Sequence, residues 1–179
     1  MTEPLFSLEN VVKTFGSRDV LSIDRLDVFP GRFYLLQGRN GSGKTTLLKI
    51  LAFLDSPSSG QLLYKGAVMG QKNLAFGRSQ VTWSPQFPVM FSGSLLYNVE
   101  FPLKLKGYDR LKRRQKAYEL LDLVSLTHLA DASAPYLSGG EAQRASLARS
   151  LATGATVLLL DEPSANIDAR SREELISCP

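Results

Sequence analysis

The first part of the chain alternates short apolar runs with polar turns. Residues 5–12 (LFSLENVV) alternate between apolar and polar positions, as in a strand at the edge of a sheet. Residues 24–29 (DRLDVF) can pair with them across a turn at Gly16–Ser17. Residues 32–37 (RFYLLQ) form a short, dense apolar run, which predicts a further strand.

Helical spacing begins directly after this run. Residues 45–54 (TTLLKILAFL) predict a helix, and the PSSG turn at 57–60 closes it. Residues 61–66 (QLLYKG) then predict another strand. The chain therefore starts as an arrangement of strand, glycine-rich loop, helix and strand.

The region from about 94 to 135 is helical in pattern. Residues 95–105 (LLYNVEFPLKL) predict a helix broken at Pro102, because proline cannot donate a helical hydrogen bond. Residues 110–126 predict a second helix, whose apolar stripe is Leu111, Ala117, Leu120, Leu121 and Val124.

The last part of the chain predicts a helix over 139–153, a buried strand over 156–160 (TVLLL), a polar loop and a short helix over 169–176 (ARSREELI). Alternating strands and helices favour an α/β core with a parallel sheet, and the middle region is a small helical insertion.

Composition restricts the class of protein only in part. A net charge of +4 suits an anionic ligand, a membrane face or nucleic acid, and does not decide among them. The single cysteine, Cys178, favours a reducing compartment. The longest apolar run, 157–160, is too short for a membrane span, and the first residues lack the pattern of a signal peptide. We expect a cytosolic chain whose membrane contact, if any, is peripheral.

Residues 38–45 (GRNGSGKT) match the phosphate-loop pattern GxxxxGK[ST]. Gly38, Gly41 and Gly43 let the backbone curl so that its N–H groups face phosphate oxygens. Lys44 adds a positive charge between the terminal phosphates, and the hydroxyl of Thr45 can reach a magnesium ion. We therefore expect a nucleotide to bind here, rather than a flexible turn that merely starts a helix.

The run VLLLDE at 157–162 places two carboxylates at the end of an apolar strand. Ligands of open α/β sheets bind at the carboxyl ends of the strands. Asp161 can hold magnesium directly or through water, and Glu162 can polarise an attacking water as a general base.

Residues 137–144 (LSGGEAQR) contain a capping box, Ser138 and Glu141, which predicts a helix start. A cap does not require two adjacent glycines, which weaken a first helical turn. Paired glycines suit a close approach of phosphate or backbone, so this helix N-terminus is a second candidate phosphate site.

Together these motifs resemble the ATP-binding cassette (ABC) ATPases, the nucleotide-binding subunits of ABC transporters. The resemblance covers nearly the whole chain, through the phosphate loop, Gln86, LSGGE, LLLDEP and SANID in the family's order. It implies a P-loop NTPase fold with a parallel sheet, antiparallel N-terminal strands and a small helical subdomain. It also implies head-to-tail dimers, in which Ser138, Gly139 and Gly140 serve the nucleotide of the partner chain.

The resemblance implies Mg²⁺ and ATP as the ligands. Phe15 is expected to stack on adenine, the alternative being a core aromatic residue. Gln86 is expected to touch magnesium or the attacking water, the alternative being a surface glutamine between prolines. Asp168 is expected to face the partner chain. The expected catalytic residues are Glu162, Gln86 and Lys44, and the expected magnesium ligands are Thr45, Gln86 and Asp161. The expected ATP-binding residues are Phe15, Gly38, Arg39, Asn40, Gly41, Ser42, Gly43, Lys44, Thr45, Thr46, Ser138, Gly139 and Gly140.

By the same resemblance, residues 1–179 are a single ABC ATPase domain. Residues 1–90 and 136–179 are its nucleotide-binding core, and residues 91–135 are its helical subdomain. The subunit is expected to hydrolyse ATP to drive solute import, on the cytoplasmic membrane face. Its expected partners are a second ABC subunit, a transmembrane permease and, indirectly, a solute-binding protein, and not nucleic acid. It looks most similar to tungstate and molybdate importers of the oxyanion type, with phosphate and amino-acid importers as rivals.

Members of the family continue beyond SANID to a further strand that ends in a switch histidine. No residue here matches that histidine, so we expect a C-terminally truncated chain with impaired turnover. The alternative function is a non-catalytic nucleotide-binding remnant. We expect His128 to be a surface residue. The seven Lys and Arg residues from Lys104 to Lys116 indicate a solvated helix face, or else a contact with acidic lipid or a membrane subunit.

Overall fold

The computed structural model describes residues 3–162, which form two compact units that divide between Val81 and Thr82. The first unit contains a four-stranded sheet in the order β2-β1-β3-β4. Its antiparallel strands are β1 (Phe6–Phe15), β2 (Arg18–Val28), β3 (Ser59–Tyr64) and β4 (Ala67–Val68). Phe15 pairs with Arg18, which confirms the predicted turn at Gly16–Ser17.

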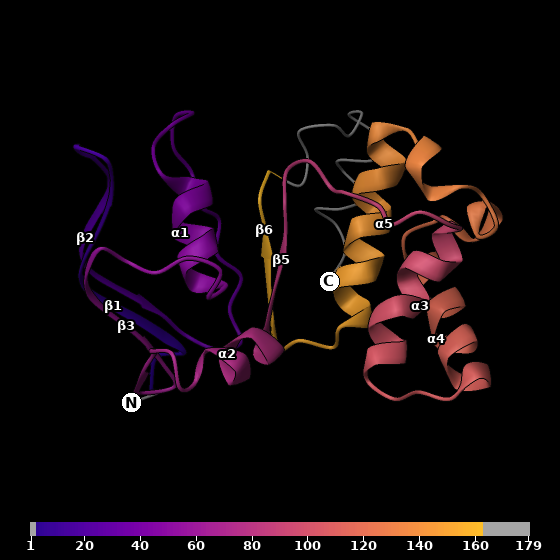
Figure 1. Cartoon of the computed structure of the whole chain (residues 1–179), viewed down its shortest axis with the longest axis horizontal. Coiled ribbons are helices and arrows are strands. Elements are labelled where there is room, and N and C mark those ends of the chain that lie inside the picture. The colour runs from indigo at the N-terminus through magenta and orange to yellow at the C-terminus, as the bar shows by residue number, and fades with distance from the viewer. Residues whose placement is uncertain (1–2, 163–179) are drawn as a thin grey trace. The chain divides into compact units, whose positions relative to one another are not determined.

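The helix α1 (Lys44–Leu51) packs on this sheet (Figure 1), with Leu47, Ile50 and Leu51 buried. It ends three residues before the predicted end, because Phe53 takes a left-handed backbone conformation with φ 58°. The Phe53 ring lies 6.1 Å from that of Phe6 and 5.6 Å from that of Tyr64. This aromatic cluster fixes the end of α1 against β1 and β3. The short helix α2 (Leu74–Gln80) completes the unit.

The predicted strand at 32–37 is wrong: the structure has no strand there. A strand exists only through hydrogen bonds to a neighbour, and none of the strands within residues 3–162 pairs with this segment. Its apolar side chains are consequently exposed, with 92% of Phe33 and 72% of Leu35 accessible to solvent.

The second unit contains a two-stranded parallel sheet of β5 (Val81–Ser84), whose first residue is the last of the first unit, and β6 (Val157–Leu160). Between these strands come α3 (Leu95–Leu105), α4 (Arg110–Leu123) and α5 (Gly139–Ala152). Two short 3-10 helices, η1 (Thr127–Leu129) and η2 (Ala134–Tyr136), lie between α4 and α5 in the sequence. Helices α3, α4 and α5 pack side by side (Figure 1), which confirms the predicted helical region and the helix predicted over 139–153.

The predicted helix break at Pro102 is also wrong, because α3 continues through this residue to Leu105. Four side chains of α3 are buried in the core that it shares with α4 and α5, namely Leu95, Leu96, Val99 and Leu103. Burying an apolar side chain of this size contributes about 1.5–3 kcal/mol, so this packing offsets the one hydrogen bond that proline cannot donate.

Two further predictions about burial need correction. Leu111 belongs to the predicted apolar stripe of α4 but is 82% exposed, whereas Ala117, Leu121 and Val124 are buried as predicted. Leu111 lies in the first turn of α4, on a side of the helix that the described residues leave open to solvent. The strand β6 confirms the strand predicted at 156–160, but its predicted burial is wrong. None of its four residues is buried and Leu158 is exposed, because β5 is its only partner among the described residues. The helix predicted over 169–176 lies outside the described residues.

Within residues 3–162, none of the helices combines the length and the apolar character needed to cross a lipid bilayer.

Candidate functional site

The phosphate loop is a sharp turn at the N-terminus of α1. Ser42 N donates to Arg39 O at 3.1 Å, and Gly41 and Gly43 have φ angles of 78° and 88°. A side chain at Gly43 would place its Cβ 2.7 Å from Val20 O, so only glycine fits between the loop and β2. The sequence therefore has glycine where the backbone is both left-handed and in close contact.

Lys44 is the first residue of α1, and its side chain folds back over the loop. Its Nζ donates to Gly38 O at 2.8 Å and to Arg39 O at 3.2 Å. Gly43 caps α1 without a side-chain hydrogen bond, so in this described segment no side chain competes for the first N–H groups of the helix. An ammonium group and a helix N-terminus at one turn make a site for an anion.

Phe15 is the last residue of β1 and lies in the same unit as the phosphate loop. Its side chain is 54% exposed, which excludes the alternative reading as a core aromatic residue. The Nζ of Lys13 lies 5.0 Å from the centroid of its ring, a distance typical of a cation–π contact.

The second unit brings Gln86 and Glu162 together. Gln86 Nε2 donates to Glu162 Oε2 at 2.5 Å, although the two residues are 76 positions apart. Glu162 has φ 48°, a left-handed conformation that is uncommon for glutamate. Gln86 is therefore not a free surface residue, since its amide holds the carboxylate that follows β6.

Asp161 is buried at the end of β6, with 4% of its surface exposed. Its N–H donates to Ser84 O at 3.0 Å, which continues the pairing of β6 with β5 by one residue. Ser84 Oγ in turn lies 2.9 Å from Ser146 Oγ on α5. The two strands and the helix α5 thus fix the position of the two carboxylates.

The LSGGE segment forms the predicted capping box at the start of α5. Ser138 N donates to Glu141 Oε2 at 2.8 Å, and Glu141 N donates to Ser138 Oγ at 3.4 Å. The Ser138 hydroxyl also donates to Glu141, and together with the Ser138 N–H it holds the pKa of that carboxyl below its usual value. Gly139 and Gly140 form the first residues of α5, and Gly139 is exposed. The backbone here is accessible to a ligand or a second chain.

The remaining predicted residues are His128, the basic region 104–116, Asp168 and Cys178. His128 is exposed in η1, as expected for a surface histidine. In the basic region, Arg113 contacts Glu100 at 3.8 Å and Lys112 contacts Asp109 at 3.6 Å, so part of this charge is already paired. Asp168 and Cys178 lie outside the described residues.

Within residues 3–162, no group of three or more His, Cys, Asp or Glu residues is placed so that it could hold a metal ion. The expected magnesium ligands are instead one hydroxyl, one amide and one carboxylate, from Thr45, Gln86 and Asp161. Magnesium is commonly held by one or two carboxylates together with substrate phosphates, so this donor set fits the ion only in company with a nucleotide.

The sequence did not predict two groups of residues that hold the segments of Phe15 and Gln86 in place. Lys13 contacts Asp55 and Ser56 O beyond the end of α1. Asn98 is fully buried in α3 and is bonded to Phe91, five residues after Gln86. The sequence does show Asn98 as a polar residue within an apolar run, LLYNVEF, which indicates a buried hydrogen bond. It does not show that the partner is Phe91, because the tertiary fold brings the two residues together.

Comparison with known proteins gives a consistent result. The family described as "ABC transporter" matches residues 21–165. The spermidine/putrescine import ATP-binding protein PotA of Chromobacterium violaceum is 38% identical over 172 residues, 96% of this chain and 47% of PotA. The sulfate/thiosulfate import ATP-binding protein CysA of Thermosynechococcus vestitus is 38% identical over 174 residues, 94% of this chain and 50% of CysA. This chain spans about half the length of these curated relatives.

Among solved structures, the dimeric bacterial ABC transporter cassette MJ0796 is similar with a TM-score of 0.87 and 30% identity, covering 96% of this chain and 79% of that chain. Another dimeric structure of MJ0796 is bound to ADP and Pi in a post-hydrolysis state. The fold is that of a P-loop NTPase of the ABC type, as the sequence predicted. The chain belongs to the ABC transporter family, as one of its ATP-binding cassettes.

Proposed function

We propose that this chain is the ATP-binding and ATP-hydrolysing subunit of an ABC importer. The observation that carries the proposal is the phosphate loop, where left-handed Gly43 starts α1 and Lys44 is held over the loop carbonyls. Its similarity to PotA and CysA, both named as import ATP-binding proteins, supports the direction of transport.

ATP would bind to the first unit through residues 38–46. The backbone of Gly38, Arg39, Asn40, Gly41, Ser42 and Gly43 would face the phosphates, with Lys44, Thr45 and Thr46 at the helix start. Two glycines leave room for this, because a side chain at Gly38 would come within 2.6 Å of Ser42 Oγ and one at Gly43 would meet Val20 O. The exposed ring of Phe15 would stack on adenine.

Thr45, Gln86 and Asp161 would hold Mg²⁺ together with the phosphates. The ion would neutralise the negative charge that builds up on the transferred phosphoryl group. Asp161 is buried and its N–H is bonded to Ser84 O, so its carboxylate would be a rigid ligand for the magnesium ion.

Glu162 would act as the general base that orients and polarises the attacking water. The hydrogen bond from Gln86 Nε2 restricts its carboxylate to one orientation, leaving the other oxygen free to accept from water. Gln86 would therefore act both on magnesium and on the base.

The chain would work as a head-to-tail dimer, in which Ser138, Gly139 and Gly140 bind the nucleotide held by the other copy. The exposed start of α5 and the dimeric structures of MJ0796 support this assembly. Residues 1–90 and 136–179 would then form the nucleotide-binding core, with residues 91–135, which include α3 and α4, as the helical subdomain.

A transmembrane permease is the second proposed partner, with the cassette bound peripherally on the cytoplasmic face of the membrane. The segment after Gln86 presents exposed apolar side chains, Phe87 at 69% and Val89 at 75%, to a cytoplasmic helix of the permease. A solute-binding protein would contact the permease rather than this chain.

For the solute, we propose an oxyanion of the tungstate or molybdate type. The similarity to CysA, named for sulfate and thiosulfate, supports this class. The equal identity to PotA makes a polyamine the second candidate. Uptake of labelled molybdate, sulfate and spermidine, in cells carrying this chain or its Lys44→Ala variant, tests the choice. Loss of spermidine uptake alone would refute the oxyanion proposal.

The direct test of the function is Mg²⁺-ATP turnover by the purified chain, with ATP-dependent dimerisation followed by light scattering. Lys44→Ala should abolish turnover, because it removes the cation of the phosphate loop. Turnover that survives in Lys44→Ala would place the activity elsewhere. ATP binding without any turnover would overturn the hydrolytic part of the proposal and favour a nucleotide-binding module.

A further inference from the structure

The end of β1 that carries Phe15 is weakly held by its sheet. Val12 paired with Ser59 is the last match between β1 and β3, so residues 13–15 pair only with β2. The register with β2 also shifts between Lys13 and Thr14. The ladder alone therefore does not fix the direction of the Phe15 ring.

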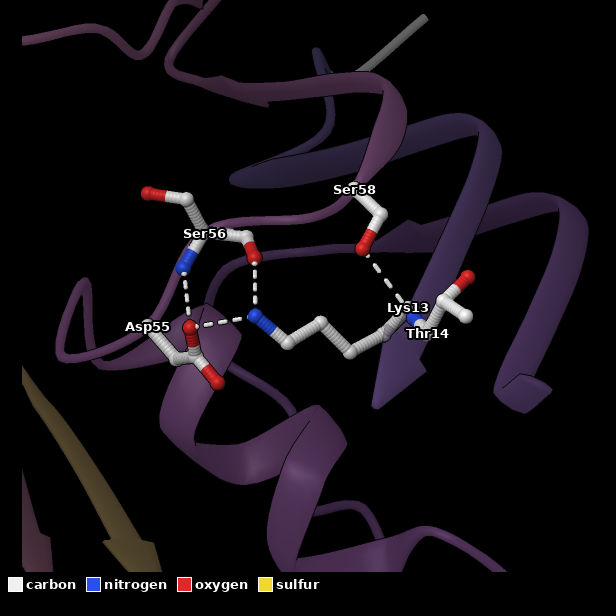
Figure 2. Close-up of polar contacts among 5 residues, drawn as sticks. All are labelled: Lys13, Thr14, Asp55, Ser56 and Ser58. Atoms are coloured by element: carbon white, nitrogen blue, oxygen red, sulfur yellow. Dashed lines mark hydrogen bonds and ion pairs between the residues drawn. The ribbon is translucent and has the colours of Figure 1, made fainter. Parts of the chain in front are cut away.

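Side-chain contacts replace the missing pairing, as Figure 2 shows. Lys13 Nζ donates to Asp55 Oδ1 at 2.6 Å and to Ser56 O at 2.8 Å, and Thr14 N donates to Ser58 Oγ at 3.0 Å. Only 12% of the Lys13 side chain is exposed. These bonds connect the end of β1 to residues 55–58, which follow α1.

Asp55 is itself fixed to α1. Its N–H donates to Lys49 O at 3.2 Å, as does that of Leu54 at 2.9 Å, so both residues extend the last turn of the helix. The other end of α1 is Lys44, at the phosphate loop. The bond from Lys13 to Asp55 thus joins the strand end that carries Phe15 to the helix that starts the phosphate loop.

We propose that Lys13 is a positioning residue for the nucleotide base. Its ammonium covers one face of the Phe15 ring, at 5.0 Å from the centroid, while Asp55 and Ser56 hold the ammonium in place. The ring, half exposed, presents its remaining surface to the base at a fixed angle to the phosphate loop. This inference rests on the proposed stacking of Phe15 on adenine.

The test compares binding of ATP with binding of tripolyphosphate, which has the phosphates but no base, by calorimetry on the whole chain. Phe15→Ala should weaken ATP binding by about fivefold to a hundredfold, the usual range for one lost base–aromatic stack. Lys13→Met should weaken ATP binding by about threefold to tenfold. Both variants should bind tripolyphosphate as tightly as the unmodified chain.

Three variants serve as controls. Lys65→Met removes a similar cation, whose Nζ lies 5.4 Å from the Tyr64 ring in the turn between β3 and β4. This variant should leave ATP binding unchanged. Lys13→Arg keeps the charge and should restore ATP affinity to within about twofold. Lys13→Met combined with Phe15→Ala should bind ATP no more weakly than Phe15→Ala alone, because Lys13 acts through the ring.

The outcomes separate the inference from the function on which it rests. Equal losses of ATP and tripolyphosphate binding in Lys13→Met would show a general structural role and overturn the inference. Unchanged ATP binding in Lys13→Met beside a weakened Phe15→Ala would overturn the inference alone. Unchanged ATP binding in Phe15→Ala would refute base stacking, and the inference with it.

Discussion

Replacing Asn98 by alanine removes the one polar side chain buried in the apolar face of α3. Asn98 is fully buried, accepts from Phe91 N at 2.8 Å, and donates to Phe91 O and Ser94 O, both at 3.0 Å. These bonds fix the segment between Gln86 and α3. The change should therefore affect both the stability of the second unit and the position of Gln86.

The magnitude follows from these three bonds, since a fourth, from Arg149 Nη1 to Asn98 Oδ1, is long at 3.5 Å. Each of the three contributes about 0.5–1.5 kcal/mol net. Phe91 N and O lose their bonds to the Asn98 amide, and the shortened side chain leaves a small cavity at a fully buried position. We expect a loss of about 2–4 kcal/mol in the free energy of unfolding, a large part of the total for a domain of this size.

Urea denaturation followed by the fluorescence of Trp83 measures this loss. Trp83 is the only tryptophan of the chain and lies in β5, so it reports on the unit that contains Asn98. With a slope of about 2 kcal/mol per molar urea, the midpoint should fall by about 1–2 M. The matched control is Gln115→Ala, which removes an exposed bond to Glu119 and should shift the midpoint little.

A midpoint for Asn98→Ala that matches the control within about 0.3 M, at an unchanged slope, would refute the reasoning. It would mean that water or neighbouring groups satisfy Phe91 once the amide is gone. A large fall in midpoint together with a normal ATP turnover would separate the stability of α3 from the position of Gln86.

Three further predictions follow from single contacts. Gly43→Ala should destabilise the first unit by about 1–3 kcal/mol more than Gly16→Ala in thermal melts. Both glycines have positive φ, but of the two only a Cβ at Gly43 would meet another atom, Val20 O, at 2.7 Å. Equal losses of stability would refute the steric argument. Glu162→Gln should lower the ATP turnover rate by about 10²–10⁴-fold while sparing ATP binding, and equal losses of both would count against a general base. Hydrogen bonds from Ser138 lower the pKa of Glu141 in the folded state, so this carboxylate stabilises the start of α5 fully above about pH 5 and ceases to do so as the pH falls from about 4.5 through the lowered pKa. The midpoint difference in urea between the unmodified chain and Glu141→Gln should accordingly be full at pH 7 and shrink progressively as the pH falls below about 4.5, and a difference that does not change with pH would contradict the assignment.

The features that the sequence predicted well are those that short segments determine by themselves. Ser138 and Glu141 form the capping box within four residues, so the start of α5 was predicted at the correct residue. The turn at Gly16–Ser17 likewise follows from residues that are next to one another. The phosphate loop was found for the same reason, because its glycines are required by the backbone of one turn.

The features that the sequence did not predict depend on distant partners. Residues 32–37 have the composition of a strand, but the described residues offer them no strand to pair with. Pro102 has the chemistry of a helix breaker, but packing against α4 and α5 keeps α3 continuous around it. Leu111 fits the apolar stripe by spacing, but no other part of the described chain covers its side chain, which is 82% exposed. In each case local preference is overruled by what the rest of the fold supplies or lacks.

Glu162 depends both on its local sequence and on distant partners. Its place after the run VLLL was evident from the sequence, but its backbone, at φ 48°, is in a region that costs a non-glycine residue about 1–3 kcal/mol. The conformation persists because other groups hold it: Asp161 N donates to Ser84 O on one side, and Gln86 Nε2 donates to the Glu162 carboxylate on the other. A carboxylate whose orientation is set by a distant amide moves when that amide moves. The segment that carries Gln86 is in turn fixed to α3 by Asn98, so the helices of the second unit have a physical route by which to change the position of the proposed base.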